Sequence, residues 1–362
     1  MAPSVPIAGA VRGRGAKSNR SGRFEPEARE DFDDGWTQED VEPARLDTVL
    51  TAERAKTIIS KNDSPDIGFD QSINPYRGCE HGCIYCYARP SHAYMGLSPG
   101  LDFETKLFYK HDAAKVLEEE LSHPRYVCKP IMLGSNTDPY QPVERRLQVT
   151  RSILTVLAKC RHPVSIVTKG VLIARDIDLL SQLASQNLAS VVMSLTTLDV
   201  EVKRTLEPRA ASPQARLKVM RQLVEAGVPT GVLVAPVVPA ITDHEMESLL
   251  EAAKEAGASS AGYVLLRLPY EVKDLFREWL AQHYPQRASH VMSLVRDARN
   301  GRDNDPNFGT RMRGTGAYAE LLRSRFKVAT RRLGLDSPRH VALSRTLFQR
   351  PGPAGSQLQL EL

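Results

Sequence analysis

Three cysteines lie within eight residues of each other in the stretch RGCEHGCIYCYARPSH: Cys79, Cys83 and Cys86. The chain has only five cysteines in 362 residues, an odd number too small for a disulfide framework, which favours metal binding or redox chemistry in a reducing compartment. Thiolates suit zinc or iron–sulfur clusters. A structural zinc normally takes four protein ligands, and His81 lies awkwardly inside the short first spacer. A three-thiolate [4Fe–4S] cluster needs no fourth protein ligand, so the spacing favours a cluster over zinc or inert buried thiols.

The elements that must position these thiols show a regular alternation. Short apolar, β-branched runs each precede a longer amphipathic run, which predicts strands followed by helices and a parallel sheet. The runs PIMLGS, PVSIVTKG, ASVVMSLTT, PTGVLVAPVV and SAGYVLLRLP predict strands, and the helices are expected at 144–160, 174–187, 212–226, 243–256 and 272–284. A further strand just before Cys79 and a helix at 113–122 bring the total to about six units.

Six units are too few for a closed eight-stranded barrel, so we predict an α/β fold built as a partial (β/α)6 barrel. A doubly wound sheet is the alternative, and in both architectures reactive groups lie at the carboxyl ends of the strands. The predicted organisation is an N-terminal arm at 1–60 that is partly disordered, the barrel at 61–285, and a basic C-terminal helical extension at 286–362.

Composition narrows the cellular setting. No window holds eighteen uncharged apolar residues, and the N-terminus lacks an apolar core long enough for a signal peptide, so no membrane span and a cytoplasmic location are expected. The formal net charge of +5 permits contact with nucleic acid without demonstrating it.

The cysteine spacing, with Tyr85 before the third cysteine, resembles the signature C-x3-C-x-aromatic-C of the radical S-adenosylmethionine (SAM) superfamily. The resemblance implies a partial (β/α)6 barrel, a [4Fe–4S] cluster on the three cysteines, and SAM bound to the open iron with Tyr85 against its adenosine. It also implies reductive cleavage of SAM to a 5′-deoxyadenosyl radical that abstracts hydrogen. A reductant such as flavodoxin or ferredoxin is the expected electron-donating partner.

A narrower resemblance connects the chain to the branch that contains spore photoproduct lyase. It rests on NPYRGCEHGCIYCYARPSH, GSNTDPYQPVE, VTKG, SLTTLD and LEPRAASPQARL, over roughly residues 60–270. Lys169 is then expected to face the SAM carboxylate, Ser194 the adenosine, and Tyr87 to relay a hydrogen atom, with a helix-packing role as the alternative for Tyr87. Further polar residues at the strand ends are candidate SAM contacts: Asn136, Thr137, Asp138 and Arg209. Asp138 could instead cap a turn, and Arg209 could pair with Glu207.

One departure from that branch concerns the reaction itself. The lyase carries a hydrogen-donating cysteine near the start of the segment that reads GSNTD here, and Ser135 occupies that position. Serine cannot substitute, because its O–H bond is much stronger than the S–H bond of a thiol. Reversal of a thymine dimer by the known route is therefore in doubt.

The C-terminal region is rich in arginine between residues 291 and 350, with Phe308, Tyr318 and Phe326 interspersed. Such a stripe could follow a phosphate backbone, although 317–333 also has the spacing of an ordinary amphipathic helix. Two functions remain open on the sequence. The first is a radical SAM enzyme, lyase-like or for repair, that acts on DNA or RNA, and the second is a non-catalytic zinc or nucleic-acid binding protein on the same scaffold.

Overall fold

A seven-stranded sheet forms the centre of the protein, in the order β10-β9-β8-β7-β6-β3-β2. The computed structural model describes residues 13–25, 46–337 and 342–352. In this part of the chain β3, β6, β7, β8, β9 and β10 pair in parallel, and β2 pairs antiparallel with β3 at one edge. The two edge strands, β10 and β2, do not pair with each other, so the sheet stays open. The strands are β2 (Ser60–Lys61), β3 (Gln71–Ile73), β6 (Ile131–Leu133), β7 (Val164–Thr168), β8 (Ala189–Leu195), β9 (Thr230–Val237) and β10 (Ser260–Leu265). The predicted partial barrel is confirmed.

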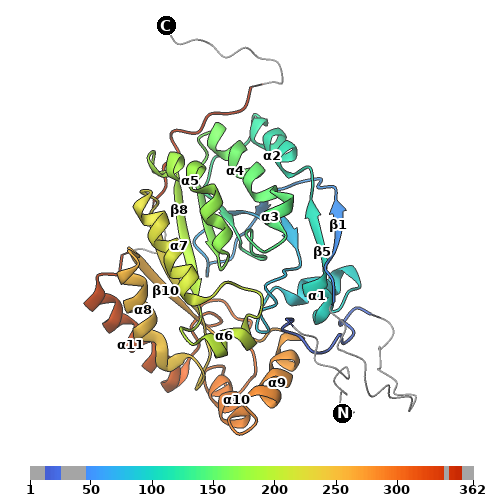
Figure 1. Cartoon of the computed structure of the whole chain (residues 1–362), viewed down its shortest axis with the longest axis vertical. Coiled ribbons are helices and arrows are strands. Elements are labelled where there is room, and N and C mark those ends of the chain that lie inside the picture. Colours follow the sequence, from blue (N-terminus) through green and yellow to red (C-terminus); the bar gives the residue numbers. More distant parts are fainter. Residues whose placement is uncertain (1–12, 26–45, 338–341, 353–362) are drawn as a thin grey trace.

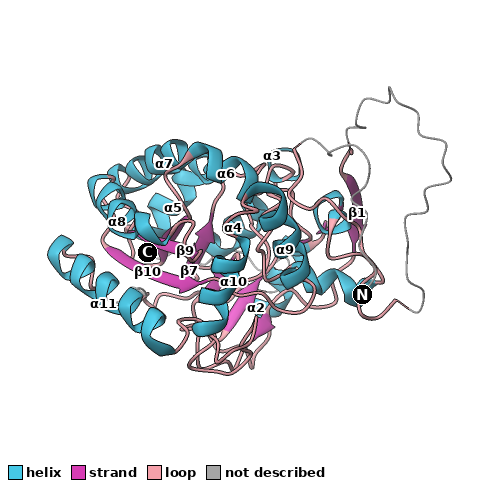
Figure 2. Cartoon of the chain, turned by 90° about the horizontal axis from the view of Figure 1, so that it is seen from below, coloured by secondary structure: helices cyan, strands magenta, loops and turns pink. Residues whose placement is uncertain are grey.

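The strands form because buried, β-branched runs suit a parallel sheet that is covered by helices. All seven residues of β8 are buried, for example. The helices that follow the strands are α4 (Val149–Lys159), α5 (Ile177–Ala184), α7 (Pro213–Glu225), α8 (Met246–Glu255) and α9 (Val272–His283), and Figure 2 shows helices beside the strands. The helix predicted at 144–160 is broken into α3 (Glu144–Leu147) and α4, because Gln148 between them has a left-handed backbone with φ of 53°.

A second, three-stranded sheet was not predicted. It has the order β1-β5-β4, with β1 (Val49–Glu53), β4 (Tyr76–Arg77) and β5 (Lys106–Lys110). The short α1 (Leu101–Thr105) leads directly into β5, and α2 (Ala113–Ser122) occupies the predicted range. Part of the predicted arm also has a defined place, since Ala16 is fully buried and packs with Cys83 and Tyr85. The predicted boundaries at residues 60 and 285 stay predictions.

Four helices gather at one end of the molecule: α1, α6 (Val200–Leu206), α9 and α10 (Ala288–Asp297) (Figure 1). Side chains from α6, α9 and α10 pack there in one hydrophobic cluster with Cys83 and Tyr85. The last helix, α11 (Gly316–Leu333), confirms the helix predicted at 317–333 and packs against α8. Among the described residues, no helix is both long enough and apolar enough to cross a membrane.

Candidate active site

The cysteine loop, residues 78–88, follows β3 and β4 and is fixed by backbone hydrogen bonds from distant segments. The Cys79 N–H donates to the Phe103 carbonyl at 2.9 Å, and the Ile84 N–H donates to the Leu206 carbonyl at 3.0 Å. Cys79 and Cys83 are buried and Cys86 is partly buried. The loop is therefore tied to α1 on one side and to the end of α6 on the other.

The side chain of Arg89 also fixes the cysteine loop, through hydrogen bonds to its carbonyls. Its guanidinium is completely buried and donates to the carbonyls of Cys83 (2.9 Å), Pro99 (3.0 Å) and Gly100 (3.0 Å). It also pairs with the buried Glu104 carboxylate at 2.5 Å. Such a planar fork of donors fixes several carbonyls at once, which a lysine could not do. Nothing in the sequence marks Arg89 as different from a surface arginine.

The donor set around the loop fits a cluster better than a single zinc ion. The loop brings three thiols, the number that a cluster with one open iron takes from the protein. His81, the fourth zinc ligand considered above, pairs through Nδ1 with Asp138 at 3.4 Å. Burial raises the pKa of the Cys83 thiol to about 12, so metal binding must release its proton.

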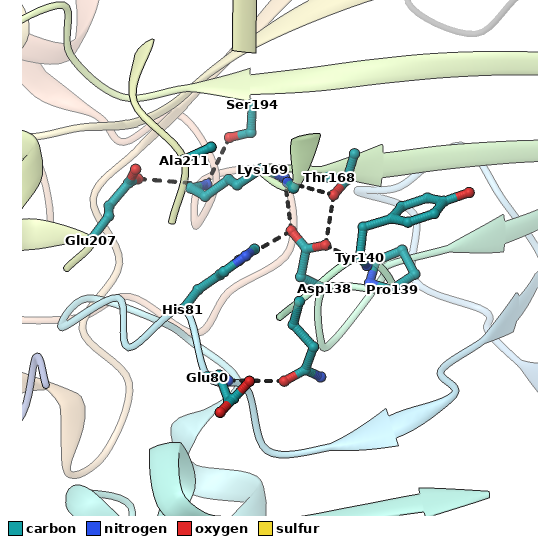
Figure 3. A network of polar contacts seen from close by, with 12 residues as sticks. Glu80, His81, Asp138, Pro139, Tyr140, Thr168, Lys169, Ser194, Glu207 and Ala211 are labelled. Atoms are coloured by element: carbon teal, nitrogen blue, oxygen red, sulfur yellow. Dashed lines mark hydrogen bonds and ion pairs between the residues drawn. The ribbon is translucent and has the colours of Figure 1, made fainter. Parts of the chain in front are cut away.

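Asp138 joins the cysteine loop to the ends of β6 and β7 (Figure 3). One carboxylate oxygen accepts from Thr168 Oγ1 at 2.6 Å and from the Tyr140 N–H at 2.8 Å, and the other accepts from the Lys169 N–H at 2.7 Å and faces His81. Burial alone would raise the pKa of Asp138, but His81 and these hydrogen bonds outweigh it and lower the pKa to about 2. Both oxygens are thus engaged within the protein, as expected for a residue that positions the site.

Lys169 lies between Ser194 and Glu207, as Figure 3 shows. Its Nζ donates to Ser194 Oγ at 2.7 Å and stands 3.9 Å from the Glu207 carboxylate. The same Nζ lies 5.8 Å from the centre of the Tyr85 ring. The structure therefore brings three of the residues that sequence analysis proposed for SAM, Tyr85, Lys169 and Ser194, to one place beside the cysteine loop.

Glu207 organises this place, and sequence reasoning missed its role. It is fully buried, forms an ion pair with Arg216, and accepts hydrogen bonds from Thr196 Oγ1 (2.6 Å) and the Tyr85 hydroxyl. Burial would raise its pKa, but Arg216, Lys169 and the two hydroxyls lower the pKa to about 2. A permanently charged carboxylate therefore fixes the Tyr85 ring and the Lys169 ammonium.

The other predicted SAM contacts each have a partner of their own within the protein. Thr137 is buried and its hydroxyl donates to the Tyr76 carbonyl at 2.8 Å, so it holds the loop after β6. Arg209 does not pair with Glu207, as the alternative proposed, but donates to Glu80 at 3.1 Å. Asn136 lines a surface cavity together with Tyr87. These roles in SAM binding stay predictions.

Tyr87, which lines the same cavity, is in contact with Ser135. Tyr87 is 48% exposed in a turn, so the helix-packing alternative is wrong, and its hydroxyl donates to the Ser135 carbonyl. The Ser135 hydroxyl is 3.0 Å from the Asn74 side-chain nitrogen, which donates to it. Asn74 also accepts from the Asn136 N–H at 2.9 Å. Ser135 is thus held at the carboxyl end of β6, next to the candidate hydrogen relay.

A partial barrel with a three-cysteine loop at the carboxyl end of its sheet defines a class of protein. The model of the radical SAM superfamily matches residues 73–253, half of the chain, and the chain belongs to this superfamily. Its cofactors are accordingly a [4Fe–4S] cluster and SAM, and it is a radical SAM enzyme.

Particular relatives are less informative about its substrate. An uncharacterized protein of Mycobacterium tuberculosis, Rv2578c, is 39% identical over 230 residues, which cover 63% of this chain and 68% of the relative. Another, MJ0683 of Methanocaldococcus jannaschii, is 27% identical and covers 64% of this chain and 83% of the relative. The solved structure of spore photoproduct lyase with dinucleoside spore photoproduct has a TM-score of 0.56 at 16% identity and covers 78% of this chain and 79% of the lyase chain. At this identity the likeness concerns the fold.

Proposed function

We propose that this radical SAM enzyme abstracts hydrogen from a nucleic acid, in a lyase-like or repair reaction. The observation that carries the proposal is the fold that the chain shares with spore photoproduct lyase, a protein solved with a dinucleoside. In this proposal Cys79, Cys83 and Cys86 hold the cluster. The cluster that these cysteines would hold would supply, from an external reductant, the electron for reductive cleavage of SAM, the chemistry from which hydrogen abstraction follows.

The residues beside the cysteine loop bind and orient SAM in this proposal. Lys169 faces the carboxylate of SAM, and Tyr85 offers its ring to the adenosine while Glu207 fixes its hydroxyl. The Ser194 hydroxyl, 3.3 Å from the Ala235 carbonyl, lies on the adenosine side. These partners come from the ends of β7, β8 and β9 and from the cysteine loop, and their hydrogen bonds hold the side chains in place.

The return of hydrogen differs from a thiol-dependent route. Ser135 cannot donate a hydrogen atom, so Tyr87, whose hydroxyl lies against the Ser135 carbonyl, is the candidate relay. The basic C-terminal region supports contact with nucleic acid in part. Arg325 and Arg332 pair with Glu247 and Glu251 of α8, whereas Arg323 and Arg331 are exposed and have no carboxylate partner in the described part of the chain.

The test is anaerobic reconstitution with iron and sulfide, followed by dithionite, SAM and an oligonucleotide. Wild type is expected to form 5′-deoxyadenosine, and Cys83→Ala is expected to form none. Deuterium transfer from a sugar-deuterated or base-deuterated strand into 5′-deoxyadenosine would identify the substrate, with undamaged DNA, ultraviolet-irradiated DNA and RNA compared in parallel. Absence of product from a protein that carries zinc and no iron would favour the non-catalytic alternative. Product without deuterium from any strand would refute the nucleic-acid substrate alone.

A further inference from the structure

A cavity of about 240 Å³ opens beside the cysteine loop, at the carboxyl ends of β6 and β10. Its lining includes Tyr87 from the cysteine loop, Asn136 from the loop after β6, and Arg267 and Tyr270 from the segment after β10. It is smaller than the pocket that a drug-sized molecule needs, so it suits one part of a larger substrate.

Among the described residues, Arg267 differs from the arginines near it in having no anionic partner. Its only hydrogen bond within the described residues runs from Nη1 to the Met312 sulfur at 3.5 Å, and its buried Nε has no partner. By contrast, Arg23 pairs with Glu271 at 3.0 Å, and Arg311 pairs with Asp66. A buried guanidinium donor without a partner costs free energy, and an anionic ligand would remove that cost.

The charges around Arg267 also favour an anionic ligand. Burial and the neighbouring Arg311 lower its pKa, with Tyr87 and Asp66 as the opposing influences. The guanidinium carbon lies 5.8 Å from the centre of the Tyr87 ring. The cavity therefore combines an aromatic face with a cation that has no counter-charge in the described part of the chain.

Two exposed aromatic rings line the same cavity. Tyr270 is 63% exposed and Tyr94 is 72% exposed. The Arg23 guanidinium from the N-terminal segment lies 4.1 Å from the Tyr270 ring centre and 5.2 Å from that of Tyr94, which fixes both rings at the rim. Aromatic platforms next to a positive charge are the usual means of holding an unpaired base and its phosphate.

We infer that Arg267 binds a phosphate of the substrate in this cavity, while Tyr87 and Tyr270 present ring faces to the adjacent base. The inference rests on the proposed function, because it assigns the part of a nucleic-acid substrate that lies nearest to the radical chemistry. Since Tyr87 adjoins Cys86, a nucleotide held here would lie close to the cysteine loop. Single-stranded or locally unpaired nucleic acid is the chemistry that fits, because a paired base presents no free face.

The test is fluorescence anisotropy of a labelled single-stranded DNA of about ten nucleotides with anaerobically reconstituted protein, without reductant, so that no turnover is needed. Arg267→Ala is expected to raise the Kd about tenfold or more, as loss of a charge-assisted pair does, and to reduce the salt slope by about 0.7. Tyr270→Ala is expected to raise the Kd at least about fivefold. Arg267→Lys keeps the charge without the fork and should lie between wild type and Arg267→Ala. Lys115→Ala, on the remote α2 and 78% exposed, is the matched control and should bind as wild type does.

The outcomes separate the two proposals. Binding by wild type that is equal in Arg267→Ala would overturn the Arg267 inference and leave the proposed function standing. Binding of adenosine monophosphate that depends on Arg267, with no binding of the strand, would support the subsite and refute a nucleic-acid polymer as substrate. If wild type binds neither ligand, the Arg267 inference is wrong, and the deuterium-transfer assay decides the proposed function separately.

Discussion

The buried Glu104 is expected to join the N-terminal segment to the cysteine loop, and Glu104→Gln tests this. The carboxylate accepts from the Gly15 N–H at 2.9 Å, from the Ala16 N–H at 2.8 Å and from Arg89 at 2.5 Å. Gly15 also packs so closely against the loop that a Cβ there would lie 1.8 Å from the Gly82 carbonyl oxygen. Glu104 therefore binds the N-terminal segment directly and supports the cysteine loop through Arg89.

The expected cost of Glu104→Gln follows from the burial of both partners. The side chains of Glu104 and Arg89 are 0% exposed, and removal of one charge from a buried pair costs about 3–5 kcal/mol. A glutamine amide would also turn its own N–H groups towards at least one of the three donors. With an unfolding entropy of about 2.1 cal/mol/K per residue, that loss lowers the thermal midpoint by roughly 4–7 °C.

Two assays measure the effect of Glu104→Gln. Scanning calorimetry gives the midpoint, and limited trypsin digestion reports whether the sites at Arg14, Lys17 and Arg20 become accessible. Glu119→Gln is the matched control, because Glu119 is 64% exposed and its partner Lys115 is 3.9 Å away. A Glu104→Gln protein with the midpoint and trypsin resistance of wild type would refute the reasoning.

Three further predictions concern a buried imidazole and the two charged centres of the site. Burial lowers the pKa of His162 from 6.5 to about 4. Between these two pH values the imidazole is protonated in the unfolded state and neutral in the folded state. Unfolding free energy should therefore fall by about 3 kcal/mol as pH decreases through that window, and His162→Gln should remove this contribution in urea titrations. Asp138→Asn places an amide N–H opposite the Lys169 N–H, so the free energy of unfolding should fall by about 3 kcal/mol. The variant should also retain no more than half of the iron that wild type takes up on reconstitution. An iron content equal to that of wild type would contradict the positioning role of Asp138. Lys169→Met should weaken SAM binding in calorimetry about tenfold or more with iron content unchanged, whereas Lys203→Met, whose ammonium contacts the Pro208 carbonyl, should bind SAM normally.

Five of the seven strands of the main sheet, β6 to β10, could be predicted because each has a local signature. For example, β7, which ends just before Lys169, and β8, which contains Ser194, are apolar, largely buried runs that lead into helices. The second sheet has no such signature. Its strand β1 reads VLTAE, and β4 has two residues, so their pairing with β5 depends on contacts between distant segments. The break at Gln148 depends on one backbone angle that no apolar pattern records.

Within the site, the sequence predicts the cluster ligands and the polar residues at the strand ends, but not the buried ion pair that supports them. The three cysteines carry a specific spacing, and Lys169 and Ser194 follow recognisable strands. Glu207 and Arg216 carry no such mark, because in sequence a buried ion pair looks the same as two surface charges. The hydrogen bond between Tyr85 and Glu207 spans 122 residues, a separation at which no periodicity connects two positions.

Buried charges around the cysteine loop are explained by what the loop itself requires. A buried ion pair is often no more stabilising than a hydrophobic packing of the same volume, so its presence calls for another reason. The loop presents carbonyls that face the interior, at Gly82 and Cys83, and Arg89 supplies donors to both. A guanidinium offers more donors than a neutral side chain and holds them in a fixed fork, and Glu104 balances its charge. The loop is thereby held from one side by Arg89 and Glu104 and from the other by the network of Glu207, which is the rigidity that a metal site needs in its supporting shell.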